Sequence, residues 1–374
     1  MKILFLSYWY PSKRNPLKGV FIKKHAHAIA AAGNKVHVLS LVIERTDDLF
    51  KKEIITDKDE KGIDHTQIAI GSKYYKLFHL LLFYQYRLLK KEAKRINASF
   101  QPQLIHSNVL YPAVILGYKL STLFNLPHVI TEHWSKVNKF MSKSLYAGIG
   151  KKAYAQAKNI TVVSNFLKEN ILSYINAANT IVVPNVVNTE LFCLKEKAEN
   201  KDSLTFTCVA HWSAPKRPDL IFYALNKFAN QCNKKLILNV IGEGKLIQEL
   251  KPMIWMFKVN YLGNQPPAEL ATTLQGSDYF LHASEIETFS IVIAEALSTG
   301  TPVLASNVGA ISELINSTSG VLTDNVVENW VIGLEKLTSR SFDHKGISES
   351  TKKFSEKLIG EQFTQLYKEI INTN

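Results

Sequence analysis

The fold class is decided by three successive stretches: KILFLS at 2–7, GVFIKKHAHAIAAAGN at 19–34 and VHVLSLV at 36–42. The first and third are short apolar runs, which are typical of buried strands. The second predicts a helix over 19–32, which a Gly-Asn pair ends. A strand, a helix and a strand in this order form a βαβ unit, which predicts a parallel sheet at the start of the chain.

Predicted strands and helices continue to alternate along the chain, in two series. The first half predicts strands at 104–106, 128–131, 160–163 and 181–183, with a helix at 112–123. Two successive series predict two doubly wound α/β domains, with a linker near 184–201 and functional residues on the loops that follow strands. The second series comprises strands at 204–209, 236–241, 259–262, 279–282 and 302–306, and helices at 219–231, 268–275, 290–299 and 325–338.

Composition and charge narrow the class of protein. The 374 residues are 46% hydrophobic and 21% charged, which fits a folded protein of two domains and excludes disordered and fibrous classes. Residues 1–186 carry 27 Lys and Arg against 11 Asp and Glu, a net charge of +16, whereas 187–374 carry 18 against 21, a net −3. The first half therefore predicts an anionic partner: nucleic acid, a membrane surface or a phosphorylated substrate.

The cysteines and the apolar runs indicate a location. The three cysteines lack a CxxC spacing, so neither a disulfide framework nor a zinc site is indicated, and a reducing cytoplasm is expected. The apolar run Ile3–Leu6 is too short for a signal peptide. The run Leu77–Tyr84 is too short to span a bilayer, which needs about 20 residues.

The stretch SEIETFSIVIAEAL at 284–297 follows a predicted strand. Glu287 lies in the loop, and Thr288 or Ser290 is expected to cap the helix that carries Glu295. The helix N-terminus offers free N–H groups to an anion, and a carboxylate accepts two sugar hydroxyls side by side. By spacing alone, a capped surface helix with solvated carboxylates explains the pattern better.

Other loops after predicted strands carry weaker signals. In HWSAPKRPD at 211–219, Lys216 and Arg217 could neutralise a phosphate pair, and an exposed basic turn fits equally well. IGEG at 241–244 reads as a tight turn. The acidic Asp57-Lys58-Asp59 has the form of a metal-binding motif, but its charged surroundings favour a solvated loop.

Together these motifs resemble those of the family 4 glycosyltransferases, which have a retaining GT-B architecture: two doubly wound Rossmann-like domains facing a central cleft. Their hallmark pair of Glu residues is matched by Glu287 and Glu295, with Thr-Phe-Ser in place of the usual Gly-Phe-Gly. Lys216 matches the family's Lys, whereas His211 replaces its usual Arg, a role that Arg217 is expected to share. Further matches are Tyr10-Pro11-Ser12, Asn15-Pro16, Gly19, Phe21, Pro184-Asn185, Ala296, Gly300, Pro302, Val303, Gly309 and Glu313.

The resemblance implies a division of the chain and a reaction. Residues 1–188 would bind the acceptor, 189–353 would bind a nucleotide sugar, and 354–374 would form a helix that crosses back to the first domain. The sugar would pass from a nucleoside diphosphate to a saccharide acceptor with retention of configuration, as in the synthesis of surface polysaccharides or glycoconjugates. No metal or other cofactor is required, because basic groups and a helix N-terminus stabilise the leaving diphosphate.

The resemblance also implies residue roles. Glu295 would hold the ribose and Glu287 the donor sugar, while Lys216 and Arg217 would hold the diphosphate. His133 is a candidate for positioning the acceptor, although a structural strand-end histidine explains it nearly as well. The catalytic candidates are thus Glu287, Lys216 and His133, and the remaining donor-binding candidates are Gly19, Gly242, Glu243, Gly263, Thr288, Phe289 and Ser290.

Residues 73–95 combine aromatic and leucine side chains with seven Lys and Arg. This composition suits an amphipathic helix on anionic lipid, and a core-packing helix with a solvated basic end is an equally good explanation. The first interpretation predicts a lipid-linked acceptor and a cytoplasmic protein that is peripheral on the inner face of the membrane.

Two other functions remain open at this point. A GT-B nucleotide-sugar epimerase would need an acid/base pair for proton transfer, and none stands out in the sequence. A basic nucleic-acid-binding protein would explain the charge of the first half, but no binding signature is visible, so no nucleic-acid partner is expected.

Overall fold

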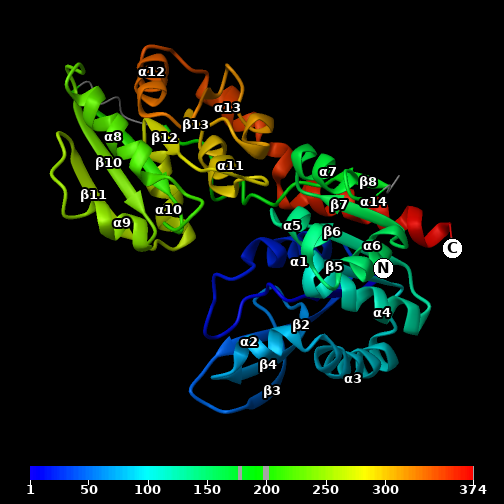
Figure 1. The fold of residues 1–374 in the computed structure, drawn as a ribbon. Helices are drawn as coiled ribbons and strands as arrows, with labels where there is room; N and C mark the ends of the chain where they lie inside the picture. The colour runs from blue at the N-terminus through cyan, green and yellow to red at the C-terminus, as the bar shows by residue number, and fades with distance from the viewer. Residues whose placement is uncertain (176–178, 197–201, 374) are drawn as a thin grey trace. The chain divides into compact units, whose positions relative to one another are not determined.

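A computed structural model describes residues 1–175, 179–196 and 202–373. The chain forms two compact units, Met1–Val186 together with Glu356–Asn374, and Val187–Ser355. In each unit, strands of a mainly parallel sheet alternate with helices (Figure 1). The α/β class with two Rossmann-like sheets is therefore confirmed. Part of the expected linker, 197–201, lies outside the described residues.

The first unit contains an eight-stranded sheet with the order β3-β4-β2-β1-β5-β6-β7-β8. The pairs are parallel except β3–β4, which is antiparallel. The opening βαβ unit is present as β1, α1 and β2, with β1 and β2 in register from Lys2–Lys35 to Ser7–Ser40. The strands are β1 Lys2–Ser7, β2 Lys35–Arg45, β3 Lys51–Lys58, β4 Asp64–Ser72, β5 Leu104–Asn108, β6 His128–Glu132, β7 Asn159–Val162 and β8 Thr180–Val182.

The final helix belongs to the first unit and packs along α1. Gly360 makes this approach close, because a Cβ there would lie 2.1 Å from the carbonyl oxygen of Ala28. The helices are α1 Val20–Ala31, α2 Tyr75–Leu80, α3 Leu82–Phe100, α4 Ile115–Phe124, α5 Val137–Lys143, α6 Ala147–Ala155, α7 Asn165–Leu172 and α14 Glu356–Asn372, with a π-helical turn at Leu110–Val114.

The segment 73–95 forms two helices rather than the single helix expected. Leu81, with φ −81° and ψ 66°, separates α2 from α3. In α3, one face is buried on the sheet side, including Leu82, Leu89 and Ile96, whereas α2 buries none of its residues. None of the helices described is long and apolar enough to cross a bilayer.

The second unit contains a six-stranded parallel sheet with the order β11-β10-β9-β12-β13-β14. Its strands are β9 Ser203–Val209, β10 Lys235–Ile241, β11 Lys258–Gly263, β12 Tyr279–His282, β13 Val303–Ser306 and β14 Gly320–Thr323. Its helices are α8 Pro218–Ala229, α9 Lys245–Leu250, α10 Pro267–Gln275, α11 Ile291–Ser298, α12 Val327–Thr338 and α13 His344–Ser350, with 3₁₀ turns at Gly309–Glu313 and Lys352–Phe354.

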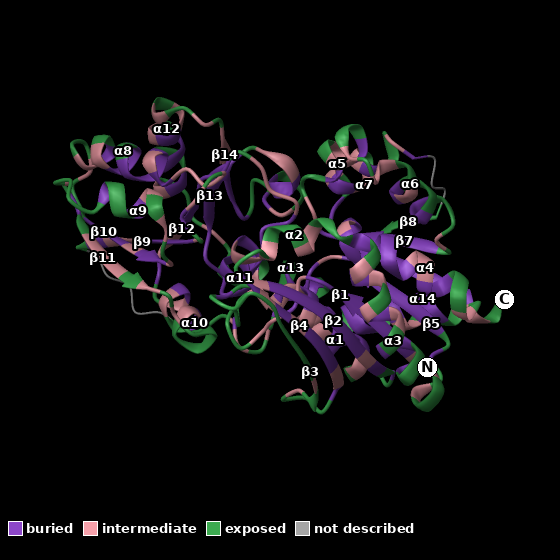
Figure 2. Ribbon diagram, turned by 60° about the horizontal axis from the view of Figure 1, so that its bottom comes forward, coloured by how far each residue is buried: buried purple, intermediate pink, exposed green. Residues whose placement is uncertain are grey.

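Burial explains why the strands read as apolar runs. Every residue of β5, β6, β7 and β13 is buried, and Figure 2 shows the sheet interiors largely in the buried colour. Helices cover both faces of such parallel sheets, so alternation of polar and apolar residues is lost. The exception is β3, an edge strand that is almost entirely exposed and whose polar sequence favours a loop.

Candidate active site

Three side chains of the second unit meet at the carboxyl edge of its sheet. Glu287 Oε1 accepts a hydrogen bond from Lys216 Nζ and another, of 2.7 Å, from His282 Nε2. Lys216 lies in the loop after β9, His282 ends β12, and a bridge between Lys216 and Ser284 joins the two loops. The structure therefore brings Glu287 and Lys216 together, as the motifs suggested, and adds His282, which sequence analysis missed.

The electrostatics of this cluster keep Glu287 ionised. Burial acts to raise its pKa, but the hydrogen bond from His282 and the charge of Lys216 outweigh burial and lower the pKa to about 2. The pKa of His282 is lowered, first by burial and then by Lys216. Near neutral pH the site thus presents a carboxylate, a neutral imidazole and an ammonium group within contact of one another.

Backbone geometry fixes the loop that carries Glu287. Gly309 has φ 56°, and a Cβ there would lie 2.1 Å from the carbonyl oxygen of Glu287. That same oxygen accepts a 3.0 Å hydrogen bond from the N–H of Ala310. Only glycine permits this approach, so the turn after β13 clamps the loop in place.

The start of α11 differs from the expected cap. Ser290 occupies the N-cap position with φ 71°, and its hydroxyl makes no capping hydrogen bond. The hydroxyl instead lies 3.4 Å from Nε2 of His282. Thr288 and Phe289 precede it in the loop, and Phe289 is buried with its ring against Phe354. The first N–H groups of α11 therefore begin next to the Lys216–His282–Glu287 cluster.

Glu295 lies on α11 and is buried, with 6% of its surface exposed. The expectation of solvated carboxylates is therefore wrong for both Glu287 and Glu295. Burial of two carboxylates on one short segment is costly unless each has partners, which favours a binding role over a surface helix.

The glycine-containing loops after β10 and β11 lie at the same edge. The N–H of Gly242 donates to the carbonyl of Gly263 over 2.7 Å, and the N–H of Trp212 donates to the carbonyl of Glu243 over 2.9 Å. Gly242 has φ 96°, and a Cβ there would lie 1.9 Å from the carbonyl oxygen of Ala210. The structure thus joins three of the predicted donor-binding residues to the loop after β9.

Arg217 lies beside Lys216 but does not contact Glu287. Its guanidinium makes a two-pronged contact with Asp219, at 2.9 and 2.7 Å, and lies 3.6 Å from Glu285. The hydrogen bond to Asp219 raises the pKa of Arg217. His211, which replaces the family's Arg, is exposed.

In the first unit, a buried carboxylate organises the loop that carries His133. Glu132 accepts hydrogen bonds from the backbone N–H groups of Leu110, His133 and Trp134 and from the hydroxyl of Tyr154, at 2.7–2.9 Å. Burial raises the pKa of Glu132 and lowers that of His133, which leaves the His133 imidazole neutral. An acidic residue at the end of an apolar strand was the sequence signal for this arrangement.

Gly19 and His133 lie in the same unit and share a neighbour. Gly19 has φ 68° at the start of α1, and a Cβ there would lie 2.0 Å from the carbonyl oxygen of Trp9. The ring of Phe21, two residues later, lies 4.9 Å from the ring of His133. The loop after β1 and the loop after β6 are thereby held together.

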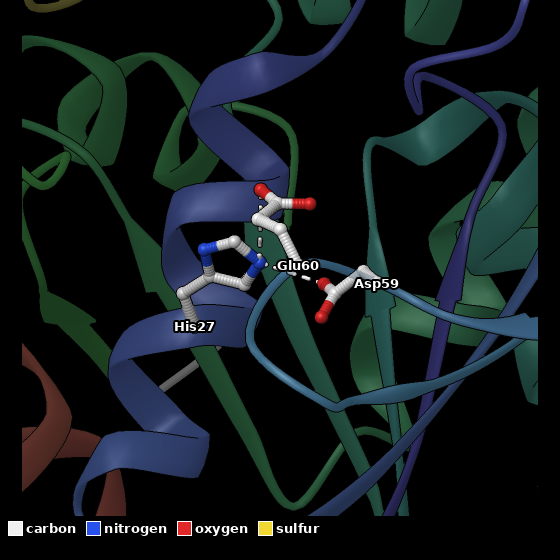
Figure 3. Close-up of side chains that lie close together, drawn as sticks. All are labelled: His27, Asp59 and Glu60. Atoms are coloured by element: carbon white, nitrogen blue, oxygen red, sulfur yellow. Dashed lines mark hydrogen bonds and ion pairs between the residues drawn. The ribbon is translucent and has the colours of Figure 1, made fainter.

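One group in the described part of the chain has metal-ligand atoms within 4.8 Å of one another: His27, Asp59 and Glu60 (Figure 3). His27 on α1 contacts Asp59 at 2.7 Å, while Lys23 pairs with Glu60 at 2.6 Å. Asp59 also accepts from the N–H groups of Lys61 and Ile63. Hydrogen bonds and ion pairs within the protein thus account for this cluster. Asp59 is half-buried rather than solvated as expected, whereas Asp57 is exposed.

Two family profiles match consecutive parts of the chain. The family described as Glycosyltransferase Family 4 matches residues 19–191, and the family described as Glycosyl transferases group 1 matches residues 191–356. The chain belongs to the family 4 glycosyltransferases. The predicted enzyme class, a glycosyltransferase, is confirmed.

Curated relatives of this glycosyltransferase are distant. An uncharacterised glycosyltransferase of Methanocaldococcus jannaschii is 26% identical over 281 residues, which cover 73% of this chain and 76% of the relative. A human phosphatidylinositol N-acetylglucosaminyltransferase subunit is 25% identical over 272 residues, which cover 70% of this chain and 53% of the human protein. The chain thus spans about half the length of that human relative.

Solved structures share the fold of this glycosyltransferase. Sucrose-phosphate synthase of Thermosynechococcus elongatus has a TM-score of 0.72 at 18% identity, covering 100% of both chains. The HepE protein of Anabaena, in complex with UDP and glucose, has a TM-score of 0.70 at 17% identity, covering 99% of this chain and 100% of that one. At these identities the likeness concerns the fold, and the predicted GT-B fold is confirmed.

Proposed function

We propose that this glycosyltransferase moves a sugar from a nucleoside-diphosphate sugar to a lipid-linked saccharide, with retention of configuration. The observation that carries the proposal is the Lys216–His282–Glu287 cluster beside the start of α11. A carboxylate, an ammonium group and free helix N–H groups at one sheet edge match the hydroxyls and phosphates of such a donor.

Each group at this edge has a role in the proposal. Lys216 and the first N–H groups of α11 hold the diphosphate, and Arg217 contributes at its periphery. Glu287 accepts hydroxyls of the transferred sugar and Glu295 those of the ribose, while the backbone of 288–290 approaches the phosphates. Gly242, Glu243 and Gly263 line the base.

The chemistry follows from where charge develops. The bond from the sugar's anomeric carbon to the phosphate oxygen breaks, a bond to the acceptor oxygen forms on the same face, and the acceptor's proton passes to the leaving phosphate. Lys216 and the α11 N-terminus stabilise the diphosphate more strongly as its charge grows. In this scheme Glu287 forms no bond to the anomeric carbon; its carboxylate, held by Lys216 and His282, accepts hydroxyls of the sugar. No metal is needed, since these groups supply the positive charge.

The acceptor binds to the first unit, where His133 positions its hydroxyl. The neutral imidazole that burial maintains can donate from one nitrogen and accept at the other. Glu132, with its four hydrogen bonds, holds the backbone of this loop in place. His133 therefore sits on a rigid support, as a positioning residue requires.

The lipid part of the acceptor indicates a membrane surface, and α2 fits one. Around α2 the exposed fractions are 53% for Leu77, 65% for Leu80 and 72% for Phe83. Lys73 and Lys76, which directly precede these residues, are exposed and suit anionic headgroups. The contact surface is thus the short segment 73–83, on the cytoplasmic face of the membrane, rather than the whole of 73–95.

The donor is tested by thermal shift and by transfer. Nucleoside diphosphates and their sugars, beginning with UDP and UDP-glucose, should raise the thermal midpoint of the full chain. Glu287→Ala and Lys216→Ala should stay folded and lose transfer at least about 100-fold. Glu285→Ala is the matched control, because its carboxylate is 60% exposed, and it should keep turnover. Full turnover in both site variants, or activity abolished by a chelator and restored by a divalent ion, would contradict the proposal.

Liposome flotation tests the membrane contact. The wild type should float with anionic vesicles, and Leu77→Ser with Leu80→Ser should reduce the floating fraction. Leu172→Ser with Leu358→Ser is the matched control, since both leucines are 38% exposed and lie on other helices. Absence of the wild type from both anionic and neutral vesicles would remove the membrane from the proposal.

A further inference from the structure

Six aromatic rings form a continuous row at the carboxyl edge of the first sheet. Successive ring centroids lie 5.2–6.4 Å apart, and Tyr111 and Tyr146 are stacked. The rings come from the loop after β1, the start of α1, the turn after β5 and the segment from the end of β6 to α6 (Figure 1). We call this row the aromatic wall; in order of contact it comprises Phe21, Trp9, Trp134, Phe140, Tyr111 and Tyr146.

The wall is partly open to solvent. All six residues are half-buried, and Trp9, Phe21 and Trp134 also pack against the core of the unit. Core aromatics of the same unit behave differently: Phe5 is 0% and Tyr154 1% exposed. Partly exposed apolar groups gathered in one row mark a binding site more often than isolated ones do.

The wall is also held rigidly. The hydroxyl of Tyr111 donates to the carbonyl of His79 over 2.8 Å, and that of Tyr146 donates to the carbonyl of Leu80 over 3.2 Å. The N–H of Trp134 is held by Glu132. Rings with two χ angles, fixed by neighbours and hydrogen bonds, lose little entropy when a ligand packs on them.

Exposed lysines lie beside the wall. Residues 133–168 contain seven Lys and no Arg, Asp or Glu. Lys136, Lys139 and Lys143 are exposed on or beside α5, the helix that carries Phe140. A ligand that covers the wall therefore meets the positive charge of the exposed lysines of α5.

We propose that the aromatic wall binds the saccharide of the acceptor, and that this saccharide carries negative charge and more than one ring. The proposal rests on the proposed function, whose acceptor it specifies. The flat C–H faces of sugar rings pack on aromatic faces, whose quadrupole is negative. Six rings offer more such area than one monosaccharide covers, and the lysines of α5 meet phosphate or carboxylate groups of the ligand.

The two ends of the wall agree with this assignment. At one end Phe21 contacts both Trp9 and His133, the residue proposed to position the acceptor hydroxyl. At the other end Tyr146 follows Leu145, which is fully exposed, and is hydrogen-bonded to Leu80 of α2. A saccharide on the wall thus runs from His133 toward the segment that we assign to the membrane.

A glycan array with the full chain, fluorescently labelled, tests the wall. It should carry neutral and acidic glycans of one to six rings, the acidic ones as separate phosphorylated and carboxylated sets, so that the source of the charge is identified. Binding is expected to acidic glycans of two or more rings. Trp134→Ala and Tyr146→Ala should each weaken it at least fivefold, and Trp134→Tyr, which keeps a ring, should weaken it less.

Controls separate the wall from general effects. Trp255→Ala removes a half-buried aromatic of the second unit and should leave glycan binding unchanged. Lys139→Gln with Lys143→Gln should reduce binding of acidic glycans only, whereas Lys234→Gln with Lys235→Gln, exposed lysines of the second unit, should have no effect. Folding of each variant is checked by its thermal midpoint.

The outcomes distinguish this proposal from the one it rests on. Suppose that UDP or another nucleotide raises the thermal midpoint. If the array then shows no bound glycan, or if Trp134→Ala and Tyr146→Ala bind glycans as the wild type does, the wall is not the acceptor site. If acidic glycans bind through the wall but no nucleotide sugar raises the midpoint, the donor proposal fails and the wall remains. Binding of neutral glycans only would overturn the inference that the ligand carries negative charge.

Discussion

Replacing Glu287 by Gln is expected to lower the free energy of unfolding of the second unit by about 3 kcal/mol at pH 7. The substitution keeps the size of the side chain and removes its charge. Lys216 Nζ and His282 Nε2 then share a neutral oxygen or face an amide group, instead of a carboxylate. The expected loss therefore measures the electrostatic part of the cluster.

The magnitude follows from the pKa of Glu287. The change of this pKa from an ordinary 4.5 to about 2 corresponds to about 3 kcal/mol of stabilisation of the folded state. Solvent screens little of this free energy because the side chain of Glu287 is only 13% exposed. Since the folded-state pKa is depressed, this stabilisation is fully present above pH 4.5 and is lost as the pH falls toward 2. The difference between wild type and Glu287→Gln should shrink over that same range.

Hydrogen exchange in increasing urea, read from peptides of β9 and β10, measures unfolding of the second unit within the full chain. Glu285→Gln is the matched control and should change the free energy by no more than about 0.5 kcal/mol, because that carboxylate is exposed. A Glu287→Gln effect equally small at pH 7, or one of constant size down to pH 3, would refute the assigned electrostatics.

Two further substitutions test the supports of the site. Gly309→Ala should displace the Glu287 loop, because the new Cβ would lie 2.1 Å from the carbonyl oxygen of Glu287, and turnover should fall at least about tenfold. The control Gly276→Ala should stay active, because a Cβ there would have no neighbour closer than 3.5 Å. Equal activity of the two variants would mean that Gly309 does not hold the Glu287 loop in place. Glu132→Gln places an amide N–H₂ group against N–H or O–H donors. Urea unfolding should therefore show that the free energy of unfolding of the first unit falls by about 2–4 kcal/mol. The exposed Glu169→Gln should cost no more than about 0.5 kcal/mol, and a similar cost for both would mean that the network is dispensable.

The parts of the fold that were predicted from sequence are those where burial governs residue choice. The strands β1 and β2 are largely apolar because helices cover both faces of their sheet. The hairpin of β3 and β4 was missed because β3 is an exposed edge strand that packs little of its side-chain surface. The break at Leu81 was missed because nothing in the local sequence forbids a continuous helix there.

The candidate residues of the site could be chosen from the sequence, but the contacts among them could not. Glu287 and Lys216 could be found from motifs, but 71 residues separate them, and only the fold brings them together. His282 reads as the last residue of an apolar strand, and its partner becomes visible only when the loop after β12 folds back on it. Glu132 likewise needs its four donors, which come from three segments of the chain, before its role can be recognised.

The cations of the proposed donor site are paired in the structure, and this pairing couples recognition of the diphosphate to recognition of the sugar. The second half of the chain has a net charge of −3, so attraction of the diphosphate depends on local groups such as Lys216. A diphosphate that draws Lys216 away leaves the buried, ionised Glu287 with one donor fewer, at a cost in free energy. Hydroxyls of the transferred sugar replace that donor, and free UDP cannot. In the thermal-shift comparison, the nucleotide sugar that fits should therefore exceed its own nucleoside diphosphate at equal concentration; equal shifts would mean that Glu287 does not contact the sugar.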